Sequence, residues 1–172
     1  MKIRYQIIFL SFFLSCCTVI KKDYDRYADI ENLKKVIPKF EKYSKYGNPK
    51  TYKVFGVQYT TLKSHIGYSE EGTASWYGKK FHGKLTSSRE KYDMYKLTAA
   101  HKTLPIPCYV KVTNLKNGIS IIVRVNDRGP FKKGRIIDLS YAAAVKLDIV
   151  AQGTEKVYVE AINVSKNNWF LL

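Results

Sequence analysis

The sequence predicts a mainly β protein in which about six short strands close into a small barrel beside one short helix. Between about residues 67 and 163, short segments rich in β-branched and aromatic residues alternate with turn-forming residues. Only Ala142–Leu147 has a helical composition in this stretch. Short strands in this number usually close on themselves, because closure removes the unpaired edges of the sheet.

The individual elements follow from turn and breaker residues. Asn117-Gly118 is a strong hairpin signal that joins two of the strands. Ser140 can cap the helix, and the prolines of Leu104–Pro107 predict an extended connector. Residues 79–93 are polar and predict a loop. The strands are expected at Gly72–Gly78, Leu97–Ala100, Tyr109–Thr113, Ile119–Val125, Ile136–Leu139 and Lys156–Ile162.

The region before the barrel predicts a tether. Apolar residues from Ile30 to Ile37 have rough helical spacing, and Pro38 ends the pattern. Tyr52–Tyr59 predicts two short strands around Gly56, with a hairpin on the main domain as one arrangement. The expected organisation is a signal peptide at 1–15, a tether at 16–66, the barrel at 67–163 and a tail at 164–172.

The first residues predict export and lipidation. Met1–Arg4 is basic and Tyr5–Leu14 is apolar but too short to span a bilayer. Ser15 directly before Cys16 resembles a bacterial lipoprotein signal, so lipidation is expected at Cys16, with Cys17 as the alternative. Several acyl chains would hold the protein to a membrane where one chain would not. An ordinary signal peptide or a buried N-terminal helix is the competing interpretation.

The charge, the histidine spacing and the cysteine content limit which kinds of ligand and partner are expected. The formal net charge is +16, which favours a polyanionic partner, although a general lysine bias explains it equally well. No zinc-finger, RNP or arginine-rich motif is present, so nucleic acid is not the expected partner. The three histidines lack metal-binding spacing, so no metal is expected. Cys108, the one cysteine outside the N-terminus, is expected to be a small buried hydrophobe.

The stretch Asn126–Phe131 is the most informative one for a site. It follows the apolar run Ile119–Val125, so Asp127 and Arg128 stand where a rigid strand becomes a sharp loop. One interpretation is a structural Asp–Arg ion pair that braces the turn. The other is a functional carboxylate held by the strand.

Longer motifs resemble the rare lipoprotein A (RlpA) family over roughly residues 46–163. The matching stretches are Gly72–Gly78, Phe81–Gly83, Glu90–Asp93, Thr98–Pro105, Val112–Leu115, Asn117-Gly118, Val123–Phe131 and Ile137–Ala144. The resemblance implies a double-psi β-barrel and action on peptidoglycan as a lytic transglycosylase without a cofactor, preferring strands without stem peptides. It also implies a lipid-anchored protein facing the periplasm, with the outer membrane favoured. We expect a monomer without the SPOR domain of many members, because the sequence stops at Leu172.

The resemblance places the catalytic pair on Glu90 and Asp127, with His101 beside them. Cleavage of a glycosidic bond requires two carboxyl groups around it, one protonated and one ionised. Burial among aromatic residues predicts a raised pKa for Glu90, which makes it the expected acid. Asp127 is expected to stay ionised beside Arg124 or Arg128. Sugar contacts are expected from Trp76, Tyr77, Phe81, Tyr92, Asn126 and Arg128, although the aromatic side chains could equally well be barrel core.

One departure from the family concerns backbone strain. Many members carry glycine directly before the catalytic glutamate, where this chain has Arg89. If that position has a positive φ, Arg89 is strained. Two other functions remain open: a glycan-binding lipoprotein of the expansin type that does not cut, and a hydrolase on the same barrel.

Overall fold

The computed structural model describes residue 30 and residues 32–164. The chain divides into two compact units, Met1–Lys34 and Lys35–Leu172. The expected signal peptide, Cys16 and Cys17 lie outside the described residues. Within the described ranges, no helix has the length and apolar character needed to cross a membrane.

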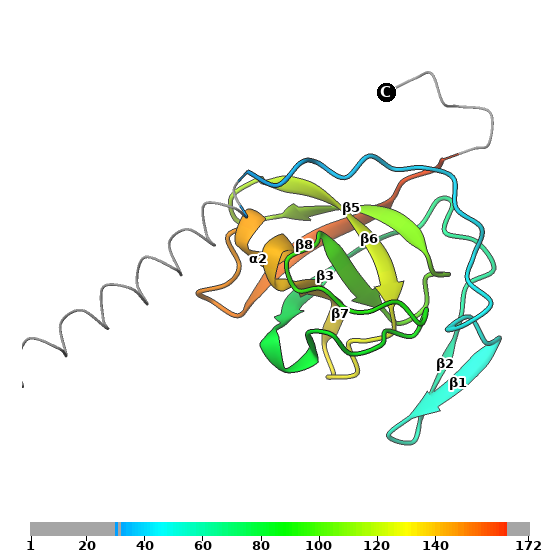
Figure 1. Ribbon diagram of the computed structural model, residues 1–172. Helices are drawn as coiled ribbons and strands as arrows, with labels where there is room; N and C mark the ends of the chain where they lie inside the picture. The colour runs from blue at the N-terminus through cyan, green and yellow to red at the C-terminus, as the bar shows by residue number, and fades with distance from the viewer. Residues whose placement is uncertain (1–29, 31, 165–172) are drawn as a thin grey trace, which may run out of the picture. The chain divides into compact units, whose positions relative to one another are not determined.

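The second unit contains a closed six-stranded barrel, which confirms the expected mainly β fold of the double-psi type (Figure 1). The strands follow one another around the barrel in the order β3-β7-β4-β6-β5-β8. Two neighbouring pairs, β3 with β7 and β4 with β6, are parallel, and the other four are antiparallel. The strands are β3 (Ser69–Tyr77), β4 (Thr98–His101), β5 (Cys108–Asn114), β6 (Ser120–Asp127), β7 (Arg135–Ser140) and β8 (Thr154–Ala161).

Alternating apolar residues fill the barrel. Val110 and Val112 of β5 pair with Val123 and Ile121 of β6, and both β5 valines and Val123 are fully buried. The helix α2 (Tyr141–Lys146) begins where expected, since the Ser140 hydroxyl accepts a hydrogen bond from the Ala143 N–H at 3.2 Å. The expected loop at 79–93 also contains a 3-10 turn, η1 (Lys79–Phe81).

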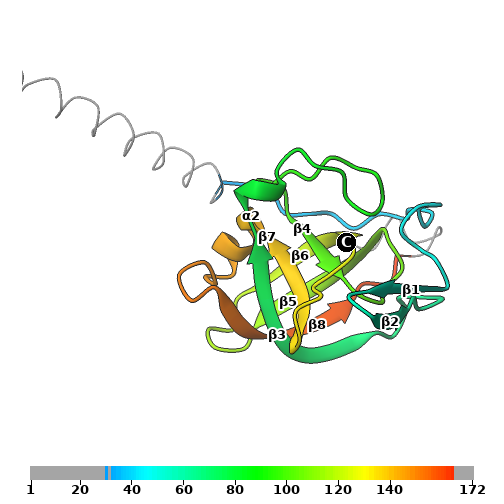
Figure 2. The ribbon, with the colours of Figure 1, turned by 90° about the horizontal axis from the view of Figure 1, so that it is seen from below.

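A β-hairpin outside the barrel confirms the two strands expected around Gly56 (Figure 2). Strand β1 (Thr51–Val54) pairs with β2 (Val57–Thr60) in antiparallel register. Phe55 and Gly56 both have positive φ, at 47° and 79°, as a type I′ turn requires. The rings of Tyr52 and Tyr59 stack at 5.3 Å, and Tyr59 lies 5.6 Å from Phe131 after β6, so the hairpin rests on the main domain.

Residues 35–66, expected as a tether, belong to the same compact unit as the barrel. The helix expected to continue to Ile37 is not formed there, since residues 33–43 have no regular secondary structure. Pro38 disfavours a helical Ile37. The residues after Pro38 are held by tertiary hydrogen bonds. The Ser44 N–H donates to the Ile106 carbonyl at 2.8 Å, and Asn48 bonds both backbone groups of Ile106. We call residues 39–48 the N-terminal strap.

Candidate active site

The site is built where β6 ends, beside a β-bulge. Ala99 of β4 pairs with Val125, but Ala100 pairs with Asp127, so Asn126 is the extra residue. Because side chains alternate along a strand, Arg124 and Asn126 share a face and both reach the carboxylate of Glu90, while Asp127 bonds a different residue, Ser87.

A tight loop brings the second carboxylate to this strand end. Leu85 and Lys91 form an isolated bridge, and the Thr86 N–H donates to the Glu90 carbonyl at 2.8 Å. The loop therefore closes on itself within a few residues. Ser87 near its tip and Glu90 at its return both contact β6.

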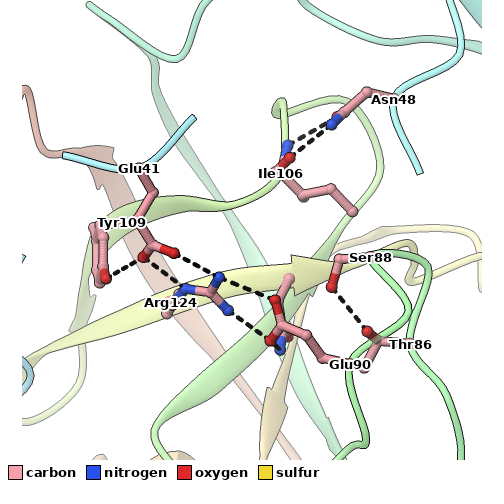
Figure 3. A network of polar contacts seen from close by, with 9 residues as sticks. Glu41, Asn48, Thr86, Ser88, Glu90, Ile106, Tyr109 and Arg124 are labelled. Carbon is pink, nitrogen blue, oxygen red and sulfur yellow. Dashed lines mark hydrogen bonds and ion pairs between the residues drawn. The ribbon is translucent and has the colours of Figure 1, made fainter. Parts of the chain in front are cut away.

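Glu90 is held by a guanidinium that it shares with a second glutamate (Figure 3). Nη1 and Nη2 of Arg124 donate to the two Glu90 carboxylate oxygens at 2.7 and 3.0 Å. Nε and Nη2 donate to the two oxygens of Glu41 at 2.9 and 2.8 Å. Asn126 Nδ2 adds a further bond to Glu90 at 2.9 Å, and the Tyr109 hydroxyl donates to Glu41 at 2.5 Å.

The expectation of a raised pKa for Glu90 is wrong for the ligand-free protein. Burial is the largest influence and on its own would raise the pKa of Glu90, but hydrogen bonds from Arg124 and Asn126 outweigh it and leave the pKa lowered. The Glu90 side chain is 40% exposed, so burial is incomplete. Glu90 is therefore ionised before a ligand binds. The sequence identified the burial but not the guanidinium opposite.

Asp127 is fixed by the loop, and its expected arginine partners are engaged elsewhere. Its Oδ1 accepts hydrogen bonds from the Ser87 N–H at 2.8 Å, the Ser87 hydroxyl at 2.7 Å and the Arg128 N–H at 2.8 Å. Within residues 32–164, no ion pair joins Asp127 to Arg124 or Arg128. The structural Asp–Arg side-chain pair considered from the sequence is not formed.

Arg128 organises the backbone around the site. Its Nε donates to the Gly47 carbonyl at 2.7 Å, and its Nη2 donates to Asn48 Oδ1 at 2.9 Å. Nη1 donates to the carbonyls of His101 and Leu104 at 3.0 and 2.6 Å. These bonds join the strap to the segment after β4. Arg128 thus acts on the site through the backbone that it holds in place.

His101 is buried and neutral. Its Nδ1 accepts hydrogen bonds from the N–H groups of Thr103 and Leu104 at 3.2 and 3.0 Å, so Nε2 carries the proton toward the Tyr68 hydroxyl at 2.8 Å. Burial, and then the nearby charges of Arg128 and Lys102, lower the pKa of His101 to about 3. Among the described hydrogen bonds, none links its ring to Glu90 or Asp127. His101 therefore orders the loop after β4.

The four aromatic candidates differ in accessibility. Tyr92 is buried, stacks on Tyr77 at 4.2 Å and donates its hydroxyl proton to the Tyr77 carbonyl at 2.5 Å. Trp76 is half-buried and lies 5.5 Å from Tyr141. Phe81 is exposed, and the Nζ of Lys80 lies 5.0 Å from its ring centre. Phe81 is accordingly the best placed of the four to meet a ligand, and Tyr92 belongs to the core.

Two cavities open beside the loop 85–91, one at each carboxylate. The cavity at Glu90 has a volume of about 540 Å³ and the cavity at Asp127 about 360 Å³. The strap lines both, through Lys39 and Glu41 at the first and through Tyr46 and Gly47 at the second. Such a surface has two carboxylates, one at each side of a short loop, which is a suitable arrangement for acid–base chemistry on an extended ligand.

Arg89 has a φ of 70°, the left-handed conformation in which a side chain at this position is expected to be strained. Its guanidinium lies 5.6 Å from the ring centre of Tyr46, which offsets part of the strain.

We expect Arg89→Gly to raise the free energy of unfolding by up to about 1 kcal/mol, because relief of strain exceeds the added entropy of the unfolded chain. Urea unfolding measures the change, and Lys91→Gly, in the same loop, is the control. A less stable Arg89→Gly protein would show that the Tyr46 contact dominates.

Two residues central to the site were missed from the sequence. Glu41 lies in a charged, aromatic stretch where no motif distinguishes it, and it reaches Arg124 across 83 residues. Ser87 lies in the predicted loop at 79–93 with no sign of a role in the site, yet it gives Asp127 two of its hydrogen bonds. A polar cluster of three hydroxyl residues just before Glu90 was the one available signal.

Residues 69–159 match the family described as lytic transglycolase. The chain is 57% identical over 142 residues to the endolytic peptidoglycan transglycosylase RlpA of Vibrio cholerae, a match that covers 83% of this chain and 54% of that protein. The proteins of the same name from Pseudomonas aeruginosa strain PA14 (52% over 136 residues, covering 79% of this chain and 39% of that protein) and Neisseria meningitidis serogroup A (59% over 113 residues, covering 66% and 47%) are also similar. The chain spans between 39% and 54% of the length of these relatives.

Proposed function

The chain belongs to the RlpA family of lytic transglycolases, and from this premise we propose that it cleaves the glycan strands of peptidoglycan and leaves 1,6-anhydro ends. The observation that carries the proposal is the placement of Glu90 and Asp127 at one strand end, under one loop and beside two cavities. We propose strands without stem peptides as the preferred substrate.

The proposed reaction uses no water. Glu90 donates a proton to the oxygen between N-acetylmuramic acid and N-acetylglucosamine, and the bond from that oxygen to C1 of the muramic acid breaks. Asp127, held by Ser87, supports the oxocarbenium-like transition state as an ionised carboxylate. The C6 hydroxyl of the same muramic acid then attacks C1, and its proton returns to Glu90.

Glu90 must gain a proton before it can act as the acid. Burial is already the largest influence on its pKa and favours the protonated form, although hydrogen bonds from Arg124 and Asn126 prevail in the free protein. A glycan in the adjoining cavity would remove water from the exposed part of the carboxyl group. We propose that this added desolvation raises the pKa of Glu90 in the complex.

The pH dependence tests this step. Because the pKa of free Glu90 is lowered, kcat/KM should decline as pH rises through a value below the ordinary glutamate pKa of about 4.3. The decline of kcat follows the pKa of Glu90 in the complex with glycan and should lie at higher pH. Steady-state rates from pH 3 to 8 with stripped glycan give both limbs. Coincident limbs would contradict substrate-driven protonation.

The surroundings of the cavities support a polysaccharide ligand. Lys39, Lys91 and Lys96 line the Glu90 cavity, and Phe81 offers an exposed ring near the loop. We propose that Phe81 and Tyr77 contact sugar faces, and that a lipid on Cys16 holds the protein at the membrane as a monomer facing the periplasm.

The decisive experiment is a digest of peptide-stripped glycan strands analysed by mass spectrometry. Products that end in 1,6-anhydro-N-acetylmuramic acid are expected. Hydrated reducing ends would replace the proposal by a hydrolase. Binding without products would replace it by a non-catalytic glycan-binding protein.

A further inference from the structure

Glu41 is a third carboxylate of the site, and the matched family region, residues 69–159, does not include it. It comes from the strap and lies opposite Glu90 on the Arg124 guanidinium (Figure 3). Its side chain is 21% exposed, against 40% for Glu90. Glu41 is therefore the more enclosed of the two, and Glu90 is the one more open to a ligand.

The hydrogen bonds divide the guanidinium between the two carboxylates. Glu41 takes the Nε edge with two bonds, and Glu90 takes the Nη1 edge, so that Nη2 is shared. The Tyr109 hydroxyl holds Glu41 from the other side at 2.5 Å. Bidentate contacts of this kind fix the plane of an arginine. Glu41 thus determines which N–H groups Arg124 presents to Glu90.

The cluster has an excess of negative charge. One guanidinium faces two ionised carboxylates, and like charges that share a partner make protonation of either one easier. Without the charge of Glu41, Arg124 would act on Glu90 alone and would hold it more firmly ionised. The other ionisable groups at this cavity are Lys39 on the strap, Lys91 at the end of the loop, Asp93 and Lys96 after it, and Tyr109 on β5.

We propose that Glu41 is a positioning residue for the reaction: through Arg124 it orients Glu90 and keeps that carboxylate able to take up the proton that it must donate. The inference rests on the proposed transglycosylase function. It assigns to the strap a part of the active site outside the matched family region.

The experiment compares Glu41→Gln and Glu41→Asp with the unmodified chain, and Glu160→Gln serves as the control. Glu160 pairs with Lys111 at 2.9 Å on β8 and β5, away from both cavities. We expect Glu41→Gln to lower the NMR titration midpoint of the Glu90 carboxyl by about one pH unit, which reduces its protonated fraction and kcat about tenfold at neutral pH. KM should change little, and Glu41→Asp should recover most of the rate because it keeps the charge.

The outcomes separate the inference from the function on which it rests. The inference would be overturned if Glu41→Gln and Glu41→Asp lost kcat and melting temperature equally while the titration midpoint of Glu90 did not move. Glu41 would then have only a structural role. Unmodified protein that gives no anhydro products would overturn the function instead. The NMR titration would then still show whether Glu41 and Glu90 are coupled.

Discussion

Replacing Asp127 by Asn is expected to slow glycan cleavage by about 10²–10³-fold, the usual effect of removing one electrostatic partner of a transition state. The fold should survive, because all three hydrogen bonds from Ser87 and Arg128 go to Oδ1, and an amide oxygen can accept them in the same place. Only the charge is lost. These bonds weaken from charged to neutral ones, which lowers the free energy of unfolding by about 1–2 kcal/mol.

Asp127→Ala provides the contrast for this prediction. It leaves the N–H groups of Ser87 and Arg128 without their acceptor, at about 1–3 kcal/mol each where they are buried. Thermal melts and initial rates of both variants distinguish the two roles. If Asp127→Asn retained nearly full activity while Asp127→Ala lost both stability and activity, Asp127 would be a brace for the loop and not a participant in the reaction.

The barrel could be predicted from the sequence because its signals are local. Alternation places Val110 and Val112 inside, and Asn117-Gly118 and Ser140 mark a turn and a cap within a few residues of their effects. The strap could not be predicted in this way. Its conformation depends on hydrogen bonds between Asn48 and Ile106, 58 residues away, and no local pattern in the sequence marks such a contact.

The site was predictable in its residues but not in their partners. Spacing along β6 shows that Arg124 and Asn126 share a face, but not that Glu90 lies above that face. The sequence therefore predicts an arginine side chain beside Asp127, whereas in the structure Arg124 binds Glu90. His101 lies in one of the stretches that resemble the family, yet its neutral ring accepts hydrogen bonds from the backbone N–H groups of Thr103 and Leu104.

The largest effect is expected at Glu90 itself. Glu90→Gln removes the proton that the proposed reaction donates to the glycosidic oxygen, and general acid catalysis is typically worth about 10²–10⁴-fold in rate. The Gln side chain nearly matches Glu in size, and binding of stripped glycan should persist through Phe81 and the surrounding lysines. Initial rates and a glycan pull-down measure the two properties separately.

The hydrogen-bond network adds a structural consequence to Glu90→Gln. The carboxylate accepts three hydrogen bonds from Arg124 and Asn126, and an amide N–H₂ in place of one oxygen faces the Arg124 guanidinium with donor against donor. A modest loss of stability should therefore accompany the loss of rate, so Glu90→Asp is the matched variant, since it keeps the acid but shortens its reach. We expect Glu90→Asp to retain more activity than Glu90→Gln at similar stability. Wild-type cleavage by Glu90→Gln would leave no acid role for this residue.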